Sequence, residues 1–90
     1  MAYPQYVVER ETILQLLDEG RTIEFISDKR PLNLVYREIW TLVKKSPRKV
    51  RVRCYRNGEL LLDDVCSLDE HALGNKLRSG VRWRIADDEA

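Results

Sequence analysis

Three side chains that lie close together in the sequence, Asp64, Cys66 and His71, are of types that can support covalent catalysis. A thiolate is a strong nucleophile, and a histidine can act as its general base when a third group orients the imidazole. Cys66 is expected at the end of a strand and His71 on a helix, so their separation in sequence fixes no geometry between them. The sequence also contains no glycine-rich phosphate-binding loop. We therefore expect a protein that is not an enzyme.

The composition also disfavours metal binding. The chain has two cysteines, Cys54 and Cys66, and one histidine, whereas closed structural zinc sites use four ligands, typically Cys and His. Two cysteines are likewise too few for the disulfide framework of a small secreted domain. We expect free thiols, no metal and no cofactor.

Charge is strongly segregated along a chain whose net charge is only +1. Residues 1–28 carry two basic and six acidic side chains, and residues 57–90 carry four basic and eight acidic ones. Between them, residues 29–56 carry ten basic side chains and one acidic one. A basic centre of this kind can attract an anionic partner. The alternative is that the fold brings the three segments together and that they neutralise one another.

The dipeptide Asn57-Gly58 is typical of the two-residue turn of a β-hairpin. Residues 49–55 before it alternate between polar and apolar, and residues 59–66 after it are rich in Leu. Pairing outward from this turn places six residues on one face of the hairpin. They are Lys49, Arg51, Arg53, Tyr55, Leu60 and Leu62.

That register has consequences for both faces. Arg53 should oppose Leu62, Asp63 should intrude among core residues on the other face, and Cys54 and Cys66 should point to opposite faces. Because Arg and Tyr are enriched at the energetic centres of interfaces, the six-residue face is the predicted partner-binding surface.

Hydrophobic periodicity predicts the remaining elements. It favours helices over 8–19 and 32–45, strands over 21–27 and 81–85, and a short helix ending near residue 78. Segment 32–45 is rich in strand-forming residues, but its apolar side chains share one side of a helical wheel. Ser67 and Glu70 are spaced as a capping box before the last helix, and the acidic residues 86–90 predict a frayed tail.

Residues 1–90 are therefore expected to form one α+β domain, with 43% hydrophobic residues available for a core. An N-terminal helix should precede a ferredoxin-like βαββαβ arrangement, an antiparallel sheet with helices on one face. Such a sheet leaves its second face open, unless the extra N-terminal helix packs there. Trp83 and Ile39 are the expected core residues.

These features predict a small binding or regulatory protein of the inhibitor or adaptor type, of a size that would suit a virus or mobile element. The expected partner is another protein, and homo-oligomers through the open sheet face are a further option. The alternative is a nucleic-acid-binding module that uses the same arginines, although residues 59–65 lack the aromatic side chains on which RNA-recognition sheets stack bases. The chain contains no apolar run long enough for a membrane span and no secretory signal, so a cytoplasmic location is expected.

Overall fold

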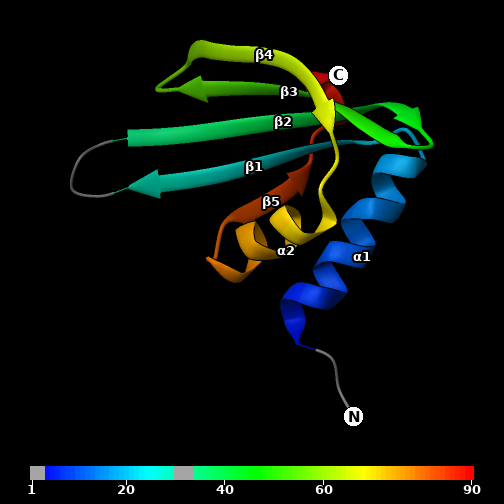
Figure 1. Ribbon diagram of the computed structural model, residues 1–90. Coiled ribbons are helices and arrows are strands. Elements are labelled where there is room, and N and C mark those ends of the chain that lie inside the picture. Colours follow the sequence, from blue (N-terminus) through cyan, green and yellow to red (C-terminus); the bar gives the residue numbers. More distant parts are fainter. Residues whose placement is uncertain (1–3, 30–33) are drawn as a thin grey trace.

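The computed structural model describes residues 4–29 and 34–90. Its main layer is a five-stranded antiparallel sheet (Figure 1). Both α-helices lie on one side of this sheet. In chain order the elements are α1 (Gln5–Asp18), β1 (Thr22–Lys29), β2 (Leu34–Lys45), β3 (Arg48–Arg56), β4 (Glu59–Ser67), α2 (Glu70–Arg78), β5 (Arg82–Ile85) and the 3-10 helix η1 (Asp87–Glu89). The predicted α+β class, the N-terminal helix and the antiparallel sheet are confirmed.

The local turn signals of the sequence are confirmed at three positions. Asn57 and Gly58 have φ values of 49° and 85°, as the predicted two-residue hairpin turn requires. Gly20 follows α1 with a φ of 87°, a left-handed conformation that glycine adopts without a Cβ clash. The predicted capping box is wrong, because Ser67 is the last residue of β4 and Asp69 caps α2 by accepting from the amides of His71 and Ala72.

The prediction of a helix over 32–45 is wrong. Its first two residues lie outside the described residues, and the rest forms strand β2. Consecutive residues Ile39 and Trp40 point to opposite faces, yet they are only 0% and 8% exposed. Because β2 is the middle strand, apolar residues occur on both of its faces, and the polar–apolar alternation of a one-sided strand is lost.

The strand order is β4-β3-β2-β1-β5, and every neighbouring pair is antiparallel. The ferredoxin-like order is therefore not found, since it needs a crossover helix where the chain has β2. Strands β1 to β4 instead pair consecutively, and β5 returns to the free edge of β1. As a result β3, which was predicted at an edge, is an internal strand, and β4 and β5 form the two edges.

The hydrophobic core lies between the two helices and the inner strands. Its buried members are Ile13, Leu14, Leu17, Ile23, Phe25, Trp40, Val50, Val52, Leu73 and Leu77. Trp83 of β5 packs against this cluster but is only partly buried. Strand β4 contributes no buried residue, because all nine of its residues are exposed.

Arg48, the first residue of β3, attaches both helices to the sheet. Its guanidinium donates to Asp18 at the end of α1, with Nη2 2.8 Å from Oδ2, and to Glu70 at the start of α2, with Nη1 2.6 Å from Oε1. Part of the basic centre of the sequence is thus neutralised by the acidic segments on either side of it.

We expect Ile39→Ala to lower the free energy of unfolding by about 2–5 kcal/mol, because it removes a fully buried side chain from the middle strand. The matched control is Val43→Ala on the same strand, where the side chain is 52% exposed and the loss should be below about 1 kcal/mol. Urea unfolding followed by tryptophan fluorescence measures both. Equal effects of the two substitutions would contradict the two-sided burial of β2.

Candidate interaction surface

The six residues predicted to form one binding face do not all share a surface. Arg51, Arg53 and Tyr55 lie on the face of β3 opposite the core residues Val50 and Val52, as predicted. Lys49 is exposed at the start of β3, where it pairs with Ser67. Leu60 opposes Tyr55, in agreement with the predicted register.

The register beyond Leu60 is wrong by one residue. A β-bulge between the Tyr55–Leu60 and Cys54–Leu62 pairs inserts Leu61 into β4. Such a bulge shifts every later side chain to the other face. Leu62 therefore opposes Cys54 on the helix side of the sheet, not Arg53.

The same shift corrects the position of Asp63. It opposes Arg53 on the face without helices, not among core residues, and its carboxylate forms a bidentate ion pair with Arg51. The distances are 2.8 Å from Nε to Oδ1 and 2.7 Å from Nη2 to Oδ2. The hydrogen bonds from Arg51 hold the pKa of Asp63 below its usual value.

The second face of the sheet is covered in part by the C-terminal segment, which was predicted to be frayed. Ala86 is fully buried, and its amide donates to the carbonyl of Thr22 at 2.8 Å. Asp87 accepts from the Thr22 amide at 3.1 Å and from Nε of Arg21 at 2.6 Å. These contacts hold the start of η1 against the beginning of β1.

Beneath η1 lies Glu24 of β1, a carboxylate that is only 2% exposed. Its Oε2 accepts from Arg37 of β2, with Nε at 2.7 Å, and its Oε1 accepts from Nε of Arg84 of β5 at 2.8 Å. These hydrogen bonds raise the pKa of both guanidinium groups. The sequence of β1 gave no signal for this buried ion-pair network, because the partners of Glu24 come from strands that only the sheet brings together.

The side chains of η1 and the residues around them extend this network. Arg37 Nη2 donates to Oε1 of Glu89 at 2.9 Å, and Arg53 Nη2 donates to the main-chain carbonyl of Glu89 at 2.6 Å. Arg84 Nη1 lies 3.2 Å from Oδ1 of Asp88. Of the predicted binding residues, Arg53 is therefore half-buried beneath the C-terminal segment, and its neighbour Arg51 is engaged with Asp63.

Strand β4 remains as the largest exposed apolar feature of the described residues. Leu60, Leu61, Leu62 and Val65 are each 48–49% exposed. Leu60 and Val65 oppose Tyr55 and Arg51, and Leu62 opposes Cys54, so apolar side chains project on both sides of this edge.

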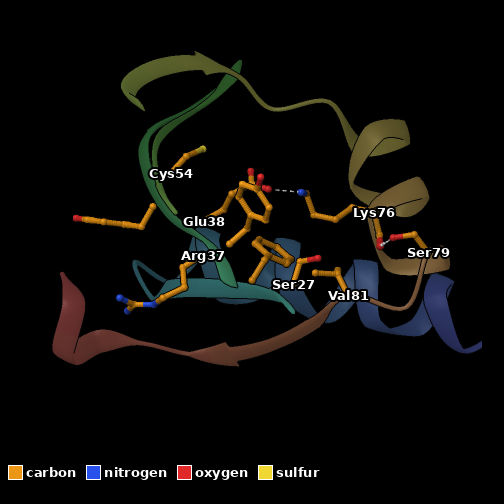
Figure 2. Close-up of a pocket in the computed structure, with 10 residues that line it drawn as sticks. Ser27, Arg37, Glu38, Cys54, Lys76, Ser79 and Val81 are labelled. Atoms are coloured by element: carbon orange, nitrogen blue, oxygen red, sulfur yellow. Dashed lines mark hydrogen bonds and ion pairs between the residues drawn. The ribbon is translucent and has the colours of Figure 1, made fainter. Parts of the chain in front are cut away.

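A hollow of about 340 Å³ lies beside α2, and residues of β1, β2 and β3 line it, but none of β4 (Figure 2). Figure 2 shows Lys76 of α2 reaching across it to Glu38 of β2, while Arg37 points away from both. Since Glu38 pairs with Cys54 and Cys54 with Leu62, one cross-strand row connects the hollow with the edge.

The two cysteines are free, as predicted, but they lie on the same face of the sheet, since Cys66 opposes the core residue Val50. Cys66 is exposed, whereas Cys54 is half-buried and burial raises the pKa of its thiol. Asp64 accepts a hydrogen bond from the amide of Val65, at 2.8 Å, and His71 lies exposed in the first turn of α2.

Within residues 4–29 and 34–90, no group of three or more His, Cys, Asp or Glu side chains is placed to hold a metal ion. None of the helices in this part of the chain has the length and apolar character needed to cross a membrane. Searches of protein-family models, curated proteins and solved structures returned no match to the chain.

We expect the protein to lose stability as the pH falls below about 4, the ordinary range of an aspartate. Hydrogen bonds from Arg48 and Arg84 lower the pKa of Asp18 and Asp88, so the unfolded chain takes up protons first. The stabilisation is fully present above the pKa that these aspartates have in the unfolded chain. It is lost as the pH falls through their lower pKa in the folded protein.

Urea midpoints measured from about pH 6 to about pH 2 test this dependence. Asp18→Asn and Asp88→Asn should each make the loss shallower, because each removes one titrating group whose pKa differs between the two states. A profile that both substitutions leave unchanged would contradict the assigned ion pairs.

We also expect the two thiols to react with an aromatic disulfide reagent in separate phases. Cys66 should react first, since it is exposed, and Cys54 should follow slowly because its thiolate is disfavoured by burial. Cys66→Ser should abolish the fast phase alone, and Cys54→Ser the slow phase alone. A single phase in the native wild-type protein would be inconsistent with the different exposure of the two residues.

Proposed function

We propose that this chain is a small non-enzymatic binding protein, of the inhibitor or adaptor type, that acts by protein–protein contact through its edge strand β4. The observation that carries the proposal is the combination of a free edge with four half-exposed apolar side chains along a strand of nine residues. Proteins usually protect such an edge with a short strand, a proline, a β-bulge or charged side chains, lysine above all. Strand β4 has a bulge at Leu61 and three carboxylates, but it is nine residues long and contains neither a proline nor a basic residue.

The backbone of β4 supports recognition by strand addition. The amide of Val65 donates to the neighbouring carboxylate of Asp64 and therefore points away from β3. In an antiparallel ladder outward-facing residues alternate with inward-facing ones, so Asp63 also presents its N–H and C=O outward. An extended segment of a partner can pair with the N–H and C=O of Asp63, in the way that peptides add to the edges of other sheets, whereas the Val65 N–H would first have to leave Asp64.

The side chains of β4 favour one kind of occupant. The strand carries three carboxylates, Glu59, Asp63 and Asp64, and only Asp63 is in an ion pair with a basic side chain within the described residues. Two copies of β4 side by side would bring six carboxylates together, which disfavours self-pairing. The expected occupant is an extended segment of another protein in which apolar side chains accompany Lys or Arg.

The arginine face gives less support to the nucleic-acid alternative. Arg37, Arg51 and Arg84 are in ion pairs with carboxylates, so phosphate would have to displace those partners. Strand β4 also carries leucines and carboxylates, and it has none of the aromatic side chains on which nucleic-acid bases usually stack. Strong, log-linear weakening of the complex by salt would nevertheless identify nucleic acid.

Affinity capture from a nuclease-treated lysate, followed by titration of the captured protein, tests the proposal. Leu60→Thr and Leu62→Thr should each weaken binding by about tenfold, because each removes apolar area at the centre of the contact. The two residues lie on opposite sides of the sheet, so only an occupant of the edge should respond to both.

The matched control is Val43→Thr, which alters a side chain of similar exposure on β2. It should leave both affinity and melting temperature nearly unchanged. Loss of binding in only one of the two leucine variants would place the contact on a face of the sheet. Binding that both variants retain would remove β4 from the interface.

A further inference from the structure

The second face of the sheet holds three guanidinium groups around one buried carboxylate. Arg84, Glu24, Ile39 and Arg53 form one cross-strand row over β5, β1, β2 and β3. Arg37 projects on the same face and is bonded to Glu24. The group formed by Arg37, Arg53 and Arg84 around Glu24 is referred to below as the arginine cradle.

Glu24 fixes the positions of two of these arginines but neutralises only one charge. Both of its oxygens are occupied, Oε2 by Arg37 and Oε1 by Arg84. Glu24 is only 2% exposed, so its carboxylate is closed off from solvent by the surrounding residues. Beyond Glu24, Arg37 donates to the carboxylate of Glu89, and Arg84 donates to Asp88 and to the carbonyl of Ile85. Both guanidinium groups therefore already bind acidic side chains of the C-terminal segment.

The chain's own C-terminal segment occupies this cradle incompletely. Glu89 gives its carboxylate to Arg37 and its main-chain carbonyl to Arg53. The Nε of Arg53 is buried without a hydrogen-bond partner among the described residues. Asp88 is 65% exposed, and its two contacts with Arg84 are long, at 3.2 and 3.5 Å. A buried cationic donor without a hydrogen-bond partner is unfavourable. A ligand that accepts a hydrogen bond from the Nε of Arg53 would therefore bind through a contact that the C-terminal segment does not make.

The segment is held firmly only at its base. Ala86 is fully buried, and Asp87 bonds both Arg21 and the amide of Thr22. Beyond Asp87, the ion pairs with Arg37 and Arg84 are partly exposed and contribute little individually. The main chain of Glu89 adds two hydrogen bonds, one accepted from Arg53 and one donated to the carbonyl of Ala86 at 2.8 Å. Residues 88–90 can therefore leave the cradle while the base stays in place.

We propose that the arginine cradle is a binding site for an acidic linear segment of a partner protein, which displaces the residues after Asp87. In the displaced state, a carboxylate of the ligand would pair with both Nε and Nη2 of Arg53, the bidentate arrangement that guanidinium groups favour. A second carboxylate would take the place of Glu89 on Arg37. This site lies on the face of the sheet without α-helices and does not depend on β4, although Arg37 also borders the hollow beside α2.

The test uses the full chain and a labelled peptide of sequence Ala-Asp-Asp-Glu-Ala, with Ala-Asn-Asn-Gln-Ala as the neutral comparison. The variant D88N/E89Q weakens the internal competitor and retains the anchor Asp87. It should bind the acidic peptide about tenfold more tightly than wild type, since the competing intramolecular contact is weakened. The neutral peptide should not bind either protein.

Two further substitutions in the D88N/E89Q background locate the site. Arg53→Lys should weaken peptide binding by about tenfold, because a lysine cannot form the bidentate pair. The matched control is Arg82→Lys, an exposed arginine of β5 outside the cradle, which should leave affinity unchanged. Equal effects of the two substitutions, or equal peptide affinity of wild type and D88N/E89Q, would overturn the proposal.

A second measurement does not depend on a substitution within the cradle. In ¹H–¹⁵N spectra of D88N/E89Q, the Nε resonance of Arg53 should shift as the acidic peptide is added, while that of Arg82 should not. No shift of Arg53 at saturating peptide would overturn the assignment. Self-association of the wild-type chain that D88N/E89Q abolishes would instead identify the acidic segment as that of a second copy, and would also overturn the proposal of a different partner protein.

Discussion

The carboxylate of Glu24 lies on the internal strand β1, on the face of the sheet that carries no α-helix, and it is almost inaccessible to solvent. A buried charge in this position would be strongly destabilising without partners. Arg37 and Arg84 provide them from the two strands on either side of β1, so the ion pairs join β2, β1 and β5 across the sheet. Ion pairs therefore join the strands on this face, whereas on the opposite face apolar side chains pack against α1 and α2. The acidic C-terminal segment follows from the same constraint, since the two guanidinium groups exceed what Glu24 can neutralise.

The helical layer reaches only part of the sheet. It buries side chains of β1, β2 and β3, while β4 pairs with β3 at the edge of the sheet and has no buried residue. The leucines of β4 are thus exposed for an architectural reason, because two short helices cannot cover five strands. Leaving apolar residues at a free edge is a hazard for a protein without a partner for them. The acidic residues of the strand reduce self-pairing, and they also set the charge of a segment that could bind there.

Several properties of the fold could be predicted from the sequence because they depend on neighbouring residues. The turn at Asn57-Gly58 requires two positive φ values, and few residues other than these tolerate them. The apolar spacing of Ile13, Leu14 and Leu17 is that of a helix with one buried side, and α1 has this form. The alternation of Val50 and Val52 with arginines placed β3 correctly between a core and a polar face. The arginines, Tyr55 and the leucines of the hairpin also led to the prediction of a binding surface, and this part stays a prediction.

What the sequence by itself determined was which segments turn, which have one buried side, and where charge is concentrated. The tertiary structure decided the rest, since a strand buried on both faces has no alternation by which to be recognised, and β2 therefore has the periodicity of a helix. The bulge at Leu61 moved Leu62 to the other side of the sheet, a shift that appears only in the pairing of β4 with β3. Only the folded sheet placed Glu24, Arg37, Arg53 and Arg84 together with Glu89, because these residues are far apart in the chain and only the pairing of their strands brings them within hydrogen-bond distance.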